Sequence, residues 1–157
     1  MRKRLISSSP GSVQARSEGC LDLERVATVE VTSEDKDSPV ELALGGEGAR
    51  GWRASTSGIQ TIRLIFDQPQ KIARISLVFE ENEAARTQEF VLRWSSNRES
   101  SLREIVRQQW NFSPPESPRE VEEYRVELAN VAILELIIKP NISGGSDRAS
   151  LKCLCLS

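Results

Sequence analysis

Apolar residues recur at every second position in one segment after another of this chain. In residues 61–67, Ile62, Leu64 and Phe66 share one side of the chain, and Thr61 and Arg63 face the other way. Successive side chains of a β-strand point to opposite faces, so this alternation is typical of half-buried strands. The same period recurs in residues 25–31, 71–80, 89–95 and 132–139. The sequence therefore predicts an all-β domain.

Short turn segments separate these runs. Glycine or serine clusters occur at 45–48, 95–98, 113–115 and 143–146, Pro69 breaks one run and Pro140 closes another. No helical segment long enough for a parallel crossover lies between the strands, so we expect antiparallel sheets that form a β-sandwich or jelly roll. Residues 149–156 are apolar on both faces, which predicts a central or well-covered strand.

Residues 117–128 fit two patterns. Ser117 and Pro118 resemble the start of a helix, with serine as the N-cap and proline at the first helical position. Alternation competes, because Tyr124, Val126 and Leu128 would share the inner face of a strand. We favour the strand.

The domain is expected to occupy residues 23–157, preceded by a mobile tail at residues 1–22. That tail is rich in serine, glycine and arginine and has no apolar periodicity. The 157 residues fit one domain with its own core.

The overall charge is close to balanced. There are 21 basic and 23 acidic residues, for a net charge of −2, so no nucleic-acid partner is expected. The first residues are basic, but no apolar stretch of a signal peptide follows, and no segment is apolar enough to span a bilayer. We therefore expect a cytoplasmic protein, and the sequence predicts no oligomeric state.

The chain contains no histidine and three cysteines. The lack of histidine excludes Ser-His-Asp and Cys-His catalysis and histidine metal ligands. Three sparse cysteines do not make a disulfide framework, so Cys153 and Cys155 are interpreted as two neighbouring buried thiols in a reducing compartment, with a metal or redox pair as the alternative. No cofactor is expected.

Taken in order, several segments resemble the discoidin, or coagulation-factor C-type, domain of the galactose-binding-like superfamily. A Trp52-containing turn precedes the strand Gln60–Phe66, and an arginine (Arg86) opens a strand centred on Phe90 that ends in serines. A late apolar strand, a glycine-rich loop and a last strand complete the pattern over residues 24–157. The resemblance implies a jelly-roll sandwich of about eight strands, with ligands on the loops at one end.

The resemblance also implies that the ligand is a sugar, a phospholipid head group or a protein. The candidate binding residues are Arg53, Arg86, Trp110 and Asn111. Arginine forks hold hydroxyls or carboxylates, and an exposed indole stacks on a sugar ring. Each has a plainer interpretation: Arg86 as a surface arginine in a weak ion pair with a nearby glutamate, and Trp110 as a core residue. Trp52 is interpreted as core or support, and Trp94 as core.

Two acidic segments, residues 33–37 and 80–83, could hold calcium, but solvated loops are the preferred interpretation and no metal site is predicted. Paired carboxylates are the only catalytic chemistry left open, and no apolar pocket is implied around them, so no enzyme is predicted. The chain is expected to differ from the extracellular discoidin domains in lacking the cysteine pair that ties the two termini together. The favoured hypothesis is therefore an intracellular protein-interaction module, and the alternative is a carbohydrate-binding module with a sugar site at the loop end.

Overall fold

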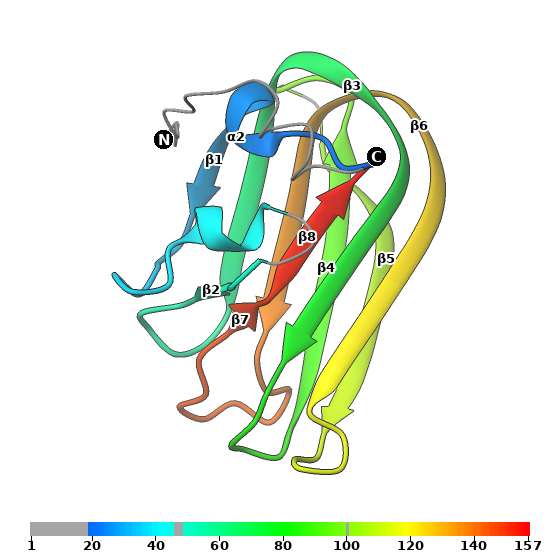
Figure 1. Ribbon diagram of the computed structural model, residues 1–157. Coiled ribbons are helices and arrows are strands. Elements are labelled where there is room, and N and C mark those ends of the chain that lie inside the picture. The colour runs from blue at the N-terminus through cyan, green and yellow to red at the C-terminus, as the bar shows by residue number, and fades with distance from the viewer. Residues whose placement is uncertain (1–18, 46–48, 100) are drawn as a thin grey trace.

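The computed structural model describes residues 19–45, 49–99 and 101–157, which form a β-sandwich (Figure 1). The short helical elements are α2 (Leu23–Val26) and η1 (Val40–Ala43). The strands are β1 (Ala27–Val31), β2 (Trp52–Arg53), β3 (Gln60–Glu80), β4 (Arg86–Ser95), β5 (Arg103–Phe112), β6 (Arg119–Lys139), β7 (Ser150–Leu151) and β8 (Cys153–Leu156). All strand pairs are antiparallel, so the predicted fold class is confirmed.

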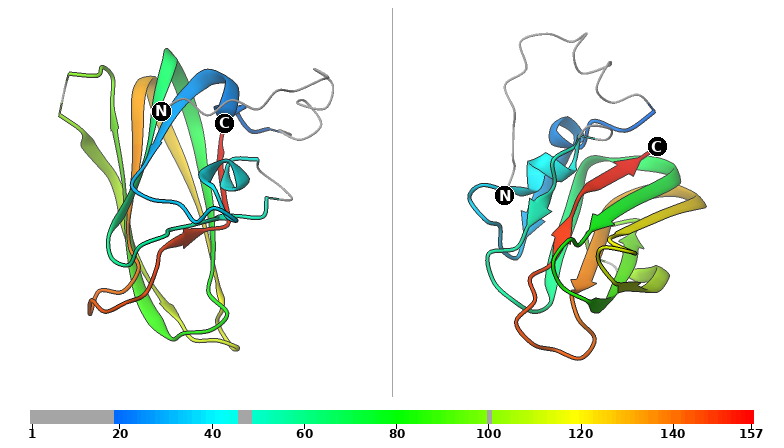
Figure 2. Two further views of the ribbon diagram at one scale, coloured as in Figure 1. Left: turned by 90° about the vertical axis from the view of Figure 1, so that its left-hand side faces the viewer. Right: turned by 60° about the horizontal axis from the view of Figure 1, so that its bottom comes forward.

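The two longest strands run through both layers of the sandwich. Residues 60–66 of β3 and 131–139 of β6 lie in one layer with β1, β4 and β5, in the order β1-β3-β6-β4-β5. Residues 72–80 of β3 and 119–128 of β6 form the other layer, with β8 along β3. Figure 2 shows the layers meeting where β3 and β6 bend over. The loops 81–85, 113–118 and 140–149 gather at the opposite end, which we call the loop end.

The bend corrects one prediction about strand boundaries. Pro69 was expected to end a strand, yet β3 continues from Gln60 to Glu80 as one element. The pairing of β3 with β6 shifts register between Ile65 and Gln70, and Pro69 lies in that interval without a ladder partner. Proline is tolerated at such an irregularity because it has no N–H to give to the ladder.

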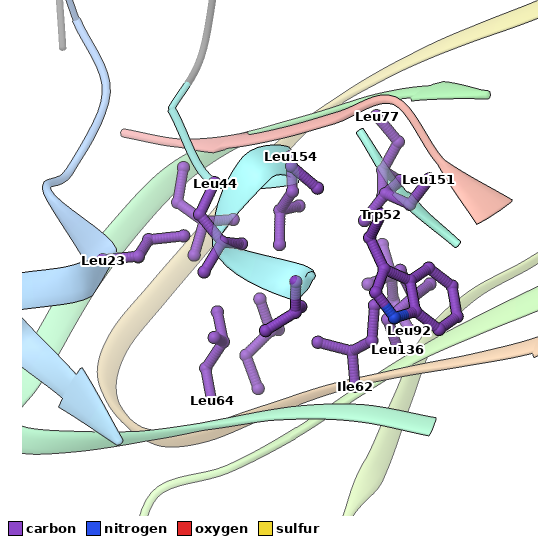
Figure 3. Close-up of a cluster of buried hydrophobic side chains, with 14 of the residues drawn as sticks. Leu23, Leu44, Trp52, Ile62, Leu64, Leu77, Leu92, Leu136, Leu151 and Leu154 are labelled. Atoms are coloured by element: carbon purple, nitrogen blue, oxygen red, sulfur yellow. The ribbon is translucent and has the colours of Figure 1, made fainter. Parts of the chain in front are cut away.

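The core fills the space between the two layers, as the alternation predicted. The inner residues of the predicted strands are almost fully buried; among them are Ile62, Leu64, Phe66, Phe90, Leu92, Leu134, Leu136 and Ile138. Figure 3 shows part of this cluster, in which Trp52 packs among leucines from several strands. Trp94 was predicted to be a core residue, but it is half-buried and packs against the edge of the core. The Arg103 guanidinium lies 5.3 Å from the centre of its ring.

The uncertain segment at 117–128 is a strand, because β6 begins at Arg119 and Tyr124 pairs with Ile75 across the ladder. The apolar C-terminal segment forms β7 and β8. Leu154 and Leu156 are buried as predicted, although β8 pairs with only one strand. Residues 1–18 of the predicted tail lie outside the described residues. No helix in the described part of the chain is long and apolar enough to cross a membrane.

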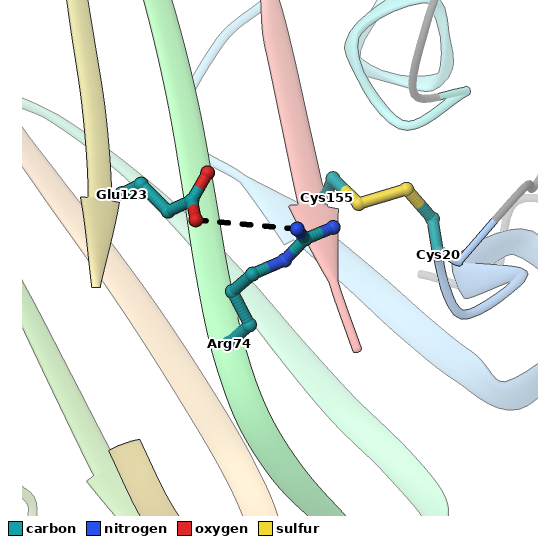
Figure 4. Close-up of a disulfide and its surroundings, with 4 residues drawn as sticks. All are labelled: Cys20, Arg74, Glu123 and Cys155. Atoms are coloured by element: carbon teal, nitrogen blue, oxygen red, sulfur yellow. Dashed lines mark ion pairs between the residues drawn. A yellow bond between two sulfur atoms is a disulfide. The ribbon is translucent and has the colours of Figure 1, made fainter. Parts of the chain in front are cut away.

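A disulfide corrects the interpretation of the cysteines. Cys20 is bonded to Cys155 over a sequence separation of 135 residues (Figure 4). The Leu21 N–H also donates to the carbonyl of Leu156 at 2.7 Å, so the two ends of the domain are held side by side. The spacing of two residues places Cys153 and Cys155 on one face of β8, which suggested two neighbouring thiols, but the partner of Cys155 is Cys20, from the other end of the chain. The pair that ties the termini is therefore present.

Candidate functional site at the loop end

Two adjoining hollows open beside β7 and the end of β3. Figure 1 shows these two segments of the backbone in its lower half. The first, of about 180 Å³, is lined by Ser38, Arg50, Gly51, Trp52, Arg53, Glu80, Asn82, Ser150, Leu151 and Lys152. The second, of about 160 Å³, is lined by Arg53, Glu80, Glu81, Asn82, Glu83, Arg148 and Ser150. They share Arg53, Glu80, Asn82 and Ser150, and together we call them the loop-end pocket. It is the candidate site because charged and amide groups from three chain segments, 50–53, 80–83 and 148–152, converge there.

The two-stranded sheet of β2 and β7 forms the floor of the pocket. Trp52 pairs with Leu151 and Arg53 with Ser150. The Trp52 ring is buried at 1% exposure, and its Nε1–H donates to the carbonyl oxygen of Ser33 at 2.9 Å. The prediction that Trp52 is a core or supporting residue is therefore confirmed. Its hydrogen bond and its packing fix the backbone from which the next side chain, Arg53, projects.

Gly51 is required where β2 approaches β7. Its φ of +102° lies in the left-handed region, and a Cβ added to it would lie 3.1 Å from the carbonyl oxygen of Leu151. Only glycine adopts such a φ without strain and leaves room for this close approach.

Arg53 is exposed because strand alternation places it on the face opposite Trp52. Within the described ranges its side chain makes no hydrogen bond or ion pair, so its guanidinium is available to a ligand. The other charges are more engaged. Glu80 lies 3.7 Å from Arg119 and 3.9 Å from Lys152, and Arg148 lies 3.8 Å from Asp35.

Arg86 lies beneath the pocket and is almost fully buried. Its guanidinium donates to Glu81 at 2.7 Å, to the carbonyl oxygen of Pro140 at 2.7 Å and to Gln88 at 3.2 Å. The ring of Phe112 lies against the same guanidinium, 4.8 Å from its carbon to the ring centre. The structure therefore places this predicted binding residue where it holds two loops of the loop end together. The surface ion pair considered for it is instead a buried one.

Glu81 is the carboxylate that pairs with Arg86 at the loop end. Burial of its carboxyl would raise its pKa, but hydrogen bonds from Arg86 and from the backbone N–H groups of Glu83 and Ala84 hold the pKa below its usual range. Glu81 is thus a carboxylate at neutral pH, and it fixes the shape of the loop 81–84 that borders the second hollow.

Trp110 and Asn111 lie on β5 and line neither hollow. Trp110 is half-buried opposite Gln88, packs against the core, and its Nε1 finds no acceptor among the described residues. Asn111 is exposed on the other face of β5, where it accepts a hydrogen bond of 2.6 Å from the Thr87 hydroxyl. Their role as ligand-binding residues stays a prediction, and the structure does not bring them together with Arg53.

The sequence reasoning missed the cationic side of the pocket, Arg148 and Lys152. Lys152 lies in the segment 149–156 that was interpreted as one apolar strand, and Arg148 directly precedes that segment. Lys152 could have been predicted from the sequence, because a lysine inside an apolar run indicates a position that faces solvent. In the structure it separates β7 from β8. The acidic segment 80–83 was noticed, but as a calcium candidate. Among the described residues no three acidic or cysteine side chains cluster as a metal site would require.

Comparisons with known proteins rest on structure alone, because no family model and no curated protein matches the sequence. Part of a GH29 fucosidase from Ruminococcus gnavus, solved in complex with fucose, superposes with a TM-score of 0.67 at 10% identity, over 93% of this chain and 28% of that one. A CBM32 module of a family 31 glycoside hydrolase from Clostridium perfringens gives 0.62 at 18% identity, over 90% and 96%. Another C. perfringens module, CpGH89CBM32-5, in complex with GalNAc-β-1,3-galactose, gives 0.63 at 16% identity, over 87% and 98%.

These similarities define the class of fold. The domain has the galactose-binding-like, or discoidin-like, β-sandwich fold of CBM32 modules, as the resemblance in the sequence implied. The match to complete modules spans nearly their whole length, whereas this chain spans 28% of the fucosidase.

Proposed function

We propose that this domain is a carbohydrate-binding module that holds its ligand in the loop-end pocket. The observation that carries the proposal is the exposed Arg53 guanidinium, which has no partner among the described side chains and lies beside Glu80, Asn82 and Ser150. Guanidinium, carboxylate, amide and hydroxyl groups together donate and accept the hydrogen bonds that sugar hydroxyls require.

The solved structures with this fold support the same proposal. They include a module bound to a galactose-containing disaccharide. The sequence favoured a protein-interaction module partly because no cysteine pair was expected to join the two termini. The Cys20–Cys155 disulfide is such a pair. A protein partner stays a prediction.

The proposed role is binding without catalysis. Glu81 is committed to Arg86, Glu80 lies between two cations and Glu83 is exposed, so none of the three carboxyls of the pocket is placed in an apolar setting that would make it a proton donor at neutral pH. The relatives with the whole of their chain matched are binding modules rather than catalytic domains.

A glycan array probed with the labelled domain tests the proposal. We expect binding to at least one glycan, and the signal should be lost in Arg53→Ala. Arg125→Ala is the matched control, because Arg125 is an exposed arginine of β6 that lines neither hollow and borders a separate pocket with residues 71–73 and 126–129. A folded wild-type protein that binds no glycan, or one whose binding is unaffected by Arg53→Ala, would contradict the proposal.

The cellular location also stays a prediction. Disulfides persist in oxidising compartments and are rare in the cytosol. The state of Cys20 and Cys155 in the native host therefore tests it: blocking free thiols at lysis, followed by mass spectrometry, should find both cysteines labelled if the protein is cytoplasmic.

A further inference from the structure

We propose that the ligand of the loop-end pocket is an acidic sugar, a unit that carries one carboxylate and free hydroxyls, such as a hexuronate. This inference rests on the proposed function and adds the chemical class of the ligand. It follows from the unequal distribution of charge between the two hollows.

The first hollow is cationic. Arg50, Arg53 and Lys152 line it, and Glu80 is the one carboxylate among its described lining residues. Glu80 already has Lys152 and Arg119 within 4 Å. The side chains of Arg50 and Arg53 are exposed and have no ion-pair partner in the parts of the chain that the structure describes. Two arginines without a counter-ion thus flank one hollow, where a ligand carboxylate could accept paired hydrogen bonds.

The second hollow, which shares Arg53 with the first, presents one carboxylate without a cation, because Glu81 is bonded to Arg86 and Glu80 lies between Arg119 and Lys152. Glu80, Glu81 and Glu83 line it, against Arg53 and Arg148. Glu83 is exposed, and its carboxylate makes no ion pair with any described residue. A carboxylate only accepts hydrogen bonds, so this hollow suits the hydroxyl donors of a sugar and repels a second anion.

Together the hollows fit a ligand with two chemically different ends. Their volumes, about 180 and 160 Å³, are suited to a saccharide of one or two rings. A ligand carboxylate beside Arg50 and Arg53 leaves the ring hydroxyls to Asn82, Ser150 and the glutamates. A neutral sugar would leave both arginines without a counter-charge, and a phosphorylated or doubly charged ligand would meet the Glu83 carboxylate of the second hollow.

The pocket offers no ring on which a neutral sugar could stack. Its one aromatic lining residue is Trp52, which is 1% exposed and committed to the core. Binding at this pocket therefore depends on polar and charged contacts, which discriminate by charge.

Matched sugar pairs test the charge preference. Methyl glycosides of galacturonate, glucuronate and mannuronate are titrated into the 15N-labelled domain alongside those of galactose, glucose and mannose, which differ only in having a hydroxymethyl group in place of the carboxylate. We expect at least one uronate to bind about tenfold or more tightly than its neutral counterpart, and to weaken as NaCl rises from 20 to 300 mM. Conversion of such a ratio to free energy gives about 1.4 kcal/mol.

Arginine variants test whether the preference for uronates arises at Arg53. Arg53→Ala should abolish the preference, Arg53→Lys should retain part of it because charge remains without the fork, and Arg125→Ala should leave it unchanged. Neutral sugars that bind as well as uronates, with binding still dependent on Arg53, would overturn the acidic ligand and leave the proposed function standing. The absence of binding to every sugar tested here and on the array would overturn both.

Discussion

Arg86 is the residue on which the shape of the loop end depends most. Its guanidinium joins the loop after β3 through Glu81 and the end of β6 through the Pro140 carbonyl, and it packs on Phe112. A buried cation with this set of partners stabilises a local structure only while all of them are present, because removal of one charge leaves the other unpaired.

Arg86→Met should therefore lower the free energy of unfolding by about 3 kcal/mol, since Glu81 would lose its cation and its pKa would rise. Urea denaturation of the variant and of the exposed control Arg125→Met measures the difference. A loss no larger than that of the control would show that the Arg86–Glu81 pair does not hold the loop end together.

Glu120 is a buried acid that keeps its proton. Burial of the carboxyl, its hydrogen bond with Glu122 and the negative charge of Glu122 raise the pKa of Glu120 to about 9, although Gln88 and Arg86 oppose the shift. The folded state therefore binds one proton more than the unfolded chain between about pH 4.5 and pH 9. In this window the contribution of Glu120 to stability falls as pH rises.

Glu120→Gln should remove that pH dependence. We expect its Tm to equal that of the wild type near pH 4.5 and to exceed it by about 10 °C or more at pH 9. Thermal unfolding followed by circular dichroism across this range measures the difference. Glu127→Gln, an exposed position of the same strand, is the control. A Tm difference that does not grow with pH would contradict the assignment of a neutral Glu120.

At the scale of elements, a row of charges crosses the outer face of the larger layer. Glu135 of β6 is 1% exposed and accepts hydrogen bonds from Arg63 of β3 at 2.6 and 2.9 Å and from Arg93 of β4 at 2.9 Å. Arg63 also pairs with Glu30 of β1 at 3.0 Å. The strand register puts these residues directly opposite one another, so the row links four strands.

Glu135→Gln should lower the free energy of unfolding by about 1–3 kcal/mol, because two arginines lose the carboxylate between them. Glu104→Gln removes an exposed pair with Arg107 and should cost at most about 1 kcal/mol. Chemical denaturation at low and high salt distinguishes the two. If both variants lost the same free energy of unfolding at low salt, and both losses disappeared at high salt, burial would add nothing to the strength of the Glu135 ion pairs.

The sequence predicted the strands whose inner rows are uninterrupted, and it missed β5. The inner positions of β5 lie opposite those of β4 and include Gln108 between Val106 and Trp110, and a register shift follows near Arg93. A polar residue and a bulge break the period of two on which the prediction depends. Among the site residues, Arg53 could be predicted because it directly follows Trp52. Lys152 lies in the pocket only because β2 pairs with β7, and no local sequence pattern predicts that pairing.

At the scale of the whole molecule, one covalent bond closes the domain. The Cys20–Cys155 disulfide joins residues 135 positions apart and lies beside β8, close to the Arg74–Glu123 pair on the neighbouring strands (Figure 4). A cross-link over so long a loop removes much of the conformational freedom of the unfolded chain.

The double variant Cys20→Ser, Cys155→Ser should lose about 4–5 kcal/mol of stability in the chain-entropy account. Cys153→Ser, which leaves the disulfide intact, is the control. Urea denaturation with and without reductant provides the measurement, and reductant should shift the midpoint of the wild type but not that of the double variant. An unchanged wild-type midpoint under reducing conditions would mean that the bond contributes nothing to stability.

A sugar is proposed to bind at the loop-end pocket rather than elsewhere on the sandwich. Amide chemical-shift mapping of the 15N-labelled domain with the tightest-binding glycan from the array tests this placement. We predict that the largest shifts fall on residues 50–53, 80–83 and 148–152, which line the two hollows. Shifts concentrated on Trp110 and Asn111, or on residues 125–129 at the bend of β6, would place the site elsewhere and contradict the claim.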